Sequence, residues 1–179
     1  MNDLLIFVAL QDEFPAALAA PHRVVYTGVG KVNAALAAAE ALASSKPALA
    51  INYGSAGAVR PGLSGLIECG RAVQRDMDLR PLGAALGETY GDAPPHDVVW
   101  REGPTVGTGD SFAIGAPELP CDLVDMEAFA LARACGRARV PFRCLKYVSD
   151  AADEAAPADW SENLAKGADL FARWLKELR

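Results

Sequence analysis

The sequence predicts an α/β fold of three layers, in which helices cover both faces of a central mixed, largely parallel sheet. Two observations predict this class. Short apolar runs of strand length alternate with helical segments along most of the chain, as in strand–helix–strand units. The length of 179 residues, with 51% hydrophobic and 22% charged residues, suits one domain over residues 1–179 with a core of its own.

The first third of the chain shows this alternation clearly. Leu4–Ala9 is an unbroken apolar run, short enough for a buried strand, and Arg23–Thr27 is typical of a second strand. The alanine-rich segment Val32–Ser45, with Leu36 and Leu42, predicts a helix that Pro47 ends, because proline cannot continue a helix. A third strand is expected over Ala48–Tyr53. Glycine-rich turns should follow the second and third strands, at Gly28–Lys31 and Gly54–Gly57.

The middle of the chain is less regular and its end is regular again. We expect a strand within Leu66–Arg75, irregular structure over Asp76–Pro95, and a short strand within Val98–Val106 that Gly103 and Pro104 interrupt. The remaining elements follow from apolar periodicity. They are a strand at Leu123–Asp125, a helix at Met126–Arg139 with an apolar stripe of Ala128, Leu131, Ala132 and Cys135, a strand at Phe142–Val148, and a final amphipathic helix at Asp159–Arg179.

Composition excludes several classes of function. The net charge is −6, and no run of lysine and arginine is present, so the chain lacks the basic surface that nucleic acids or anionic membranes require. No apolar run approaches about 20 residues and no basic segment opens the chain, so we expect a cytoplasmic protein. The four cysteines form no CxxC pair, which favours reduced thiols. His22 and His96 are too few for a histidine-rich metal site, and we expect neither metal nor cofactor.

In open α/β sheets, ligands bind beyond the carboxyl ends of the strands. The segments expected there carry several carboxylates, one aromatic ring and two glycine-rich turns, a set that suits sugar hydroxyls, a flat heterocycle and acid–base chemistry. These candidate residues are Glu13, Ser55, Asp110, Phe112, Met126, Glu127 and Asp150.

Three common nucleotide and hydrolase motifs fail on single positions. The dinucleotide fingerprint needs glycine or alanine where Asn33 stands. The P-loop needs glycine at Val25 and serine or threonine at Val32, and a nucleophile elbow around Ser55 needs glycine at Tyr53.

Five local strings stand out in a fixed order. They are Thr27-Gly28-Val29-Gly30-Lys31-Val32-Asn33-Ala34-Ala35, Asn52-Tyr53-Gly54-Ser55-Ala56-Gly57, Gly107-Thr108-Gly109-Asp110-Ser111-Phe112, Val124-Asp125-Met126-Glu127-Ala128 and Val148-Ser149-Asp150-Ala151-Ala152-Asp153. Together they resemble the nucleoside phosphorylase/hydrolase superfamily, and most closely its 5′-methylthioadenosine/S-adenosylhomocysteine nucleosidases. The resemblance runs from about Leu4 to the C-terminal helix and weakens between Leu66 and Val106.

The resemblance implies two catalytic residues and a substrate site. Asp150 matches the aspartate that holds the purine and protonates N7, and Glu13 matches the glutamate that activates the attacking water. Met126 and Glu127 match the pair that lines the ribose, with Glu127 accepting from its 2′- and 3′-hydroxyls.

Further substrate contacts are implied on both sides of the ribose. Phe112 matches the ring that stacks on the base, and the backbone of Ala113 would read the base edge. The remaining implied positions are Ser55 near the nucleophile, Lys146 near the attacking water, and Ser149 beside Asp150. Trp160 falls, by its spacing, where the family has an aromatic over the 5′ substituent. The resemblance also implies a homodimer that takes a small purine nucleoside as its partner.

The chemistry is coherent on physical grounds. A purine leaves poorly as an anion, so an acid must protonate N7, and burial at a strand end can raise the pKa of an aspartate enough for this. The ribose becomes oxocarbenium-like as the bond stretches, and a second carboxylate can position water on the opposite face.

Each candidate also has a purely structural interpretation. Asp150 could cap the turn after its strand, Glu13 could be a solvated first-turn charge, and Glu127 could be a helix-start acid. Met126 and Phe112 could belong to the core, Ser55 to a turn, and Trp160 to the core or an interface.

Departures from the resemblance keep other functions open. The chain is shorter than the family pattern around Ala20–Arg23, Arg60–Leu66 and Asp76–His96, and Lys146 stands where an arginine is expected, which keeps the charge without the planar fork. No arginine is placed by motif to grip phosphate, so hydrolysis is the leading prediction. The alternatives are a phosphate-dependent purine nucleoside phosphorylase, a hydrolase of a modified nucleoside such as futalosine, and a nucleoside-binding protein without catalysis.

Overall fold

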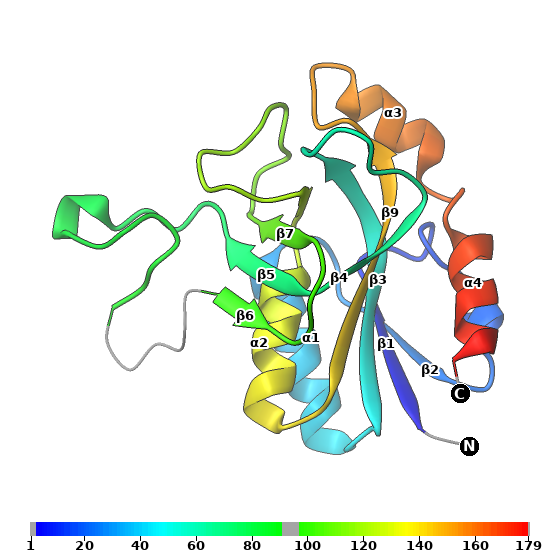
Figure 1. The fold of residues 1–179 in the computed structure, drawn as a ribbon. Coiled ribbons are helices and arrows are strands. Elements are labelled where there is room, and N and C mark those ends of the chain that lie inside the picture. The colour runs from blue at the N-terminus through cyan, green and yellow to red at the C-terminus, as the bar shows by residue number, and fades with distance from the viewer. Residues whose placement is uncertain (1–2, 91–96, 179) are drawn as a thin grey trace.

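The computed structural model describes residues 3–90 and 97–178, and these residues form one mixed sheet with helices on both faces (Figure 1). His96 and residues 91–95 of the predicted irregular segment lie outside the described residues. The strands are β1 Leu4–Val8, β2 Arg23–Tyr26, β3 Leu49–Ala58, β4 Leu66–Cys69, β5 Arg71–Gln74, β6 Asp97–Val99, β7 Thr105–Thr108, β8 Leu123–Asp125 and β9 Phe142–Asp150. The α-helices are α1 Lys31–Ser44, α2 Ala128–Ala138, α3 Ala156–Asn163 and α4 Ala168–Glu177, with 3₁₀ turns at Ala16–Ala19 and Arg80–Leu82.

The sheet is largely parallel, as predicted. The pairs β1–β2, β1–β3, β3–β9, β5–β7 and β7–β8 are parallel, whereas β3–β8, β4–β9 and β5–β6 are antiparallel. The long strand β3 is the centre of this arrangement: it pairs with β1 along its first half, with β8 at Gly57 and Ala58, and with β9 along almost its whole length. The strands β1, β3 and β9 therefore run in the same direction, and the short antiparallel β8 meets β3 at its carboxyl end.

The two faces of the sheet have different cores. On one face α1 and α2 pack alanines and small apolar side chains against Leu5 and Phe7 of β1. On the other face α4 packs Phe171 and Leu175 against Ile6 and Tyr53 (Figure 1). Burial of both faces explains why β1 is apolar at every position.

Three sequence predictions need correction. The segment Gly54–Gly57 is part of β3 and not a turn, because its glycines leave room for side chains from neighbouring elements: a Cβ at Gly57 would lie 2.6 Å from Asp150 Oδ1. The single strand expected over Leu66–Arg75 is two, since the chain switches at Gly70 from pairing with β9 to pairing with β7. The final helix is also two, α3 and α4.

The apolar stripe of α2 is confirmed, because Ala128, Leu131, Ala132 and Cys135 are all buried. The helix predicted over Val32–Ser45 is confirmed as α1. Leu42 is buried, but Leu36 is 66% exposed, since the buried face of α1 consists mainly of alanines. Among the described helices, none is both long enough and apolar enough to cross a membrane.

Candidate active site

A cavity lies at the carboxyl ends of the central strands, where the sequence places its candidates. Eight of the ten predicted site residues line it: Glu13, Ser55, Phe112, Ala113, Met126, Glu127, Asp150 and Trp160. Its other lining residues are Ala9, Leu10, Val29, Ala56, Gly57, Arg75, Ser111, Val124 and Asp125. Strands β3, β8 and β9, the turn after β1, the loop after β7 and helix α3 all contribute to its wall.

Glu13 is held firmly at one side of this cavity. It lies in the turn that follows β1 and is only 4% exposed, so the interpretation as a solvated charge is wrong. Its Oε1 accepts hydrogen bonds from the backbone N of Ser55 (2.9 Å) and from Ser55 Oγ (2.7 Å), and its Oε2 accepts one from the backbone N of Leu10 (3.2 Å). A Cβ at Gly54 would lie 3.4 Å from Glu13 Oε1, so glycine there lets the carboxylate approach β3 closely. All of these partners donate, which suits a carboxylate that only accepts.

Asp150 ends β9 and also lines the cavity. Its Oδ2 accepts a hydrogen bond from Ser149 Oγ (2.6 Å) and its Oδ1 accepts one from the backbone N of Ala152 (2.9 Å). The second bond is the local turn contact that the structural interpretation predicts. Asp150 makes this contact and also lines the cavity. Asp150 is half-buried, less enclosed than the burial argument expects.

Glu127 is directed into the site from the start of α2. It is 7% exposed, and its Oε1 accepts a hydrogen bond from the backbone N of Gly30 (2.9 Å) in the glycine-rich turn before α1. Burial, followed by the nearby charge of Asp125, raises the pKa of Glu127 to about 7. When ionised, a buried carboxylate at this position can accept charge-assisted hydrogen bonds from the hydroxyl groups of a ligand.

Lys146 does not line the cavity, and neither does Ser149. This is a correction to the predicted set: both residues lie behind the wall. Lys146 is 1% exposed and its Nζ lies 2.7 Å from Asp125 Oδ2. Burial by itself would lower the pKa of Lys146, but the surrounding Asp125, Cys144 and Glu127 together outweigh burial, so the pKa is raised. Ser149 Oγ donates to Asp150 instead, so it supports a lining residue from behind.

Asp125 is the buried partner of this lysine, and the sequence argument missed its importance. Its Oδ2 also accepts from the backbone N of Ala128 (2.8 Å) at the start of α2, and its Oδ1 accepts from Thr108 Oγ1 (2.5 Å) in β7. Asp125 thereby ties β7, β8, α2 and β9 together beneath the cavity. Its place two residues before Glu127, at the end of a strand, was the available signal.

The loop after β7 forms the more exposed side of the cavity. Phe112 is 44% exposed, so the interpretation as a core residue is wrong, and its ring meets Trp160 edge-on at 6.3 Å between ring centroids. Arg75 holds this loop, since its guanidinium donates to Ser111 Oγ (3.2 Å) and to the carbonyl of Ser111. Met126 is partly buried and lines the cavity, and Asp110 lies outside it, where its Oδ1 accepts from the backbone N of Lys31.

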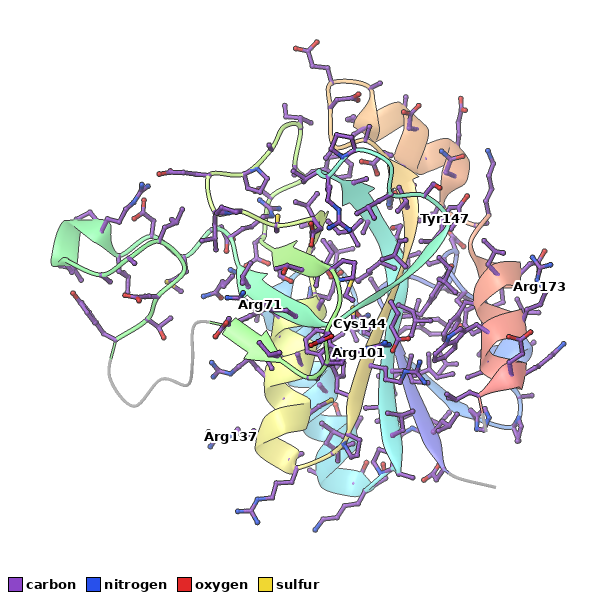
Figure 2. The ribbon with its side chains drawn as sticks, in the orientation of Figure 1. Arg71, Arg101, Arg137, Cys144, Tyr147 and Arg173 are labelled. Atoms are coloured by element: carbon purple, nitrogen blue, oxygen red, sulfur yellow. The ribbon has the colours of Figure 1, made fainter. Side chains whose placement is uncertain are left out.

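Arg75 is the single arginine of the described residues that lines the cavity, and its guanidinium is hydrogen-bonded to Ser111 of the loop that carries Phe112. Arginines at other positions are engaged in ion pairs: Arg71 with Asp97, and Arg101 and Arg143 with Glu68. Figure 2 shows Arg71 on β5, Arg137 on α2 and Arg173 on α4, well apart from one another.

The chain matches the model of the phosphorylase superfamily over residues 18–87 and 98–178. It belongs to this superfamily. A 5′-methylthioadenosine/S-adenosylhomocysteine nucleosidase from Actinobacillus succinogenes is 31% identical over 164 residues, which cover 77% of this chain and 71% of that relative. The nucleosidase of the same description from a Marinomonas species is 31% identical over 181 residues, covering 85% and 78%.

Solved structures agree on the fold. A mutant of the Helicobacter pylori nucleosidase with 5′-methylthioadenosine in its active site has a TM-score of 0.87 at 20% identity, with 99% of this chain and 97% of that chain covered. A futalosine hydrolase mutant from the same organism has a TM-score of 0.88 at 20% identity, with 98% and 97% covered. The predicted three-layer fold of phosphorylase/hydrolase type is confirmed.

Proposed function

We propose that this protein hydrolyses the N-glycosidic bond of a purine nucleoside, with 5′-methylthioadenosine and S-adenosylhomocysteine as its substrates. One observation carries the proposal: two carboxylates, Glu13 and Asp150, line one cavity, and each is held by hydrogen-bond donors. The names of the 31% identical relatives support the choice of substrate.

In this proposal Asp150 acts as the general acid. It gives its proton to N7 of the purine. When the C1′–N9 bond breaks, N9 takes the electron pair and the base leaves as a neutral molecule. Phe112 would stack on the base, and the Ala113 backbone would contact its edge, because both line the cavity on that side. Trp160 would cover the 5′ substituent.

The second half-reaction takes place at the sugar end of the cavity, the part lined by Glu13, Met126 and Glu127. Glu127 would accept from the ribose hydroxyls, beside Met126, and Glu13 would take a proton from the water whose oxygen attacks C1′. The products are the free base and a sugar with a hydroxyl at C1′. Solvent must then return the proton from Glu13 to Asp150 before the next turnover.

Water is the favoured acceptor because of the charges at the sugar end. A phosphate dianion needs cationic donors, usually paired arginines, whereas Glu13 and Glu127 would repel it. Among the described residues, Arg75 is the only arginine in the cavity wall, and it is engaged with the loop at the base end. Lys146 is already paired with Asp125.

Product analysis tests the proposal. Methylthioadenosine, adenosylhomocysteine, adenosine, inosine and futalosine are incubated with the protein, with and without phosphate, and products are identified by mass spectrometry. We expect free base and no sugar 1-phosphate in phosphate-free buffer. Glu13→Gln should lower kcat by about 10²-fold or more, since general base catalysis contributes about that much. Asp12→Asn, at the exposed neighbouring acid, is the control and should stay within about twofold.

Strict dependence on phosphate with a sugar 1-phosphate product would assign the phosphorylase reaction instead. Preferential turnover of futalosine would assign the modified nucleoside as substrate, an outcome that the H. pylori futalosine hydrolase makes worth testing. Nucleoside binding without any base release would leave a binding protein of this fold.

We also propose a homodimer of single-domain subunits. The nine strands belong to one continuous sheet, which supports one domain. Val32 and Leu36 of α1 are 68% and 66% exposed, and Val32 lines a groove between α1 and α2. A second copy of the chain could cover this apolar surface. Sedimentation of the protein and of Leu36→Glu should give a dimer and a monomer, respectively.

The four free cysteines support a reducing, cytoplasmic compartment.

A further inference from the structure

Helix α3 is attached over the cavity at two points. Trp160 Nε1 donates a hydrogen bond to Ser55 Oγ on β3 (2.9 Å), and three residues later Asn163 Nδ2 donates to the carbonyl of Ser149 on β9 (2.7 Å). These two attachments place α3 beside both candidate catalytic carboxylates, since Ser55 contacts Glu13 and Ser149 contacts Asp150.

The hydrogen bonds from Trp160 to Glu13 form a chain with a fixed direction. An indole N–H can only donate and a carboxylate can only accept. Ser55 has one hydroxyl proton, so its oxygen accepts from Trp160 and its proton is directed to Glu13 Oε1 (2.7 Å). Linked hydrogen bonds polarise one another, so the first bond strengthens the second.

Without the indole N–H this direction would be lost. The Ser55 hydroxyl would have one fewer constraint on its rotation, and Glu13 would retain its backbone donors from Ser55 and Leu10 alone. A phenylalanine at position 160 would keep the ring against Phe112, but it could not make the bond to Ser55.

We propose that Trp160 is a positioning residue for Glu13, acting through the Ser55 hydroxyl, and that the general base is fully oriented only when α3 is seated on the sheet. This inference rests on the proposed function, because it assumes that Glu13 activates the nucleophile. Trp160 then has a second role besides covering the substrate. This role depends on a single atom of its side chain, the donor Nε1.

The test is a double-mutant cycle on base release. Trp160→Phe should lower kcat about tenfold, which corresponds to about 1.4 kcal/mol, and should leave KM within about threefold. Ser55→Ala should lower kcat by at least as much. The double variant should equal Ser55→Ala within about twofold, because Trp160 acts through the hydroxyl that is already gone.

A second tryptophan provides the control. Trp174 is half-buried in α4, where it stacks on Phe171 at 5.8 Å and does not line the cavity. Trp174→Phe should keep kcat and KM, and thermal unfolding of each variant shows whether it is folded. If Trp160→Phe is unfolded, Asn163→Ala, which releases the other attachment of α3, must lower kcat in its place.

The outcomes separate the two proposals. If the wild-type protein releases base but Trp160→Phe keeps its kcat, or if the losses in the double variant multiply, the positioning role is wrong and the proposed function stands. A rise in KM with unchanged kcat would show that Trp160 only covers the substrate. If the wild-type protein releases no base from any nucleoside, the proposed function fails and this inference fails with it.

Discussion

The two ends of the cavity are built in different ways. At the end that we propose for the sugar, Glu13 in the turn after β1 and Glu127 at the start of α2 are buried, and backbone N–H groups hold them. At the end that we propose for the base, Phe112 and Ile114 lie on a loop and are 44% and 63% exposed. That loop is held by side chains, mainly Arg75.

The two ends of the cavity are therefore preorganised to different degrees. Backbone groups at strand ends are fixed by sheet register, so the carboxylates at the sugar end are already oriented. A loop is fixed by fewer contacts, and a bound base would complete its packing. We therefore expect substitutions at the sugar end to affect stability and rate, and substitutions in the loop to affect mainly substrate affinity.

The largest effect is expected on stability, at the ion pair beneath the sugar end. Lys146→Met leaves Asp125 buried without its cation and should lower the free energy of unfolding by about 3–5 kcal/mol. Lys146→Met combined with Asp125→Asn should recover much of that loss, since no charge remains unpaired. Urea unfolding measures both. Lys46→Met, at an exposed lysine, should stay within about 0.5 kcal/mol. A loss below about 1 kcal/mol in Lys146→Met would show that the pair is not a structural tie.

The next effect concerns the proposed acid. Asp150→Asn keeps the shape of the side chain and its contact with Ala152, but it cannot deliver a proton to N7. We expect kcat to fall by at least about 10²-fold with little change in unfolding temperature. Asp153→Asn, at an exposed aspartate three residues away, should be near wild type. A near-normal kcat in Asp150→Asn would remove the proposed mechanism.

A pH dependence should come from Glu127. Its pKa is raised to about 7, so the ionised form that accepts hydroxyls is lost as the pH falls through 7, and kcat/KM should drop about tenfold for each pH unit below that. Because the folded state holds this proton more tightly than the unfolded state, the contribution of Glu127 to stability should decline as the pH rises from about 4.5 to 7 and then level off. Glu127→Gln should abolish both trends. A limb of the pH–rate profile that persists in this variant belongs to another group.

The smallest effect is expected in the loop. Phe112→Leu keeps apolar contact but removes the face on which a base would stack, so KM should rise about five- to tenfold while kcat and unfolding temperature change little. Ile114→Ala, in the same loop but outside the cavity wall, is the control and should stay within about twofold. An equal effect of both variants would mean that loop stability is altered and not base stacking.

Much of the sugar end could be predicted from the sequence. Glu13 and Glu127 each follow within five residues of the end of a strand, and the carboxyl ends of neighbouring parallel strands meet at one edge of an α/β sheet. Asp150 was predicted by the same reasoning, and it lines the cavity with them. Lys146 was misplaced because its position just before the string that contains Asp150 does not show how deeply it is buried, and it is buried because β9 pairs with β3 and β4.

Most of the strands and helices, the apolar stripe of α2 and the set of polar residues at strand ends could be predicted from the sequence, because these features depend on local periodicity and chemistry. The tertiary structure alone decided which of those residues meet. Trp160 contacts Ser55 across 105 positions of the chain, and Lys146 reaches Asp125 from a strand on the other side of β3. Such contacts depend on the order of strands in the sheet and on how the helices pack, which follow from non-local pairing and close packing. Periodicity shows which face of an element is buried, but not which other element packs against that face.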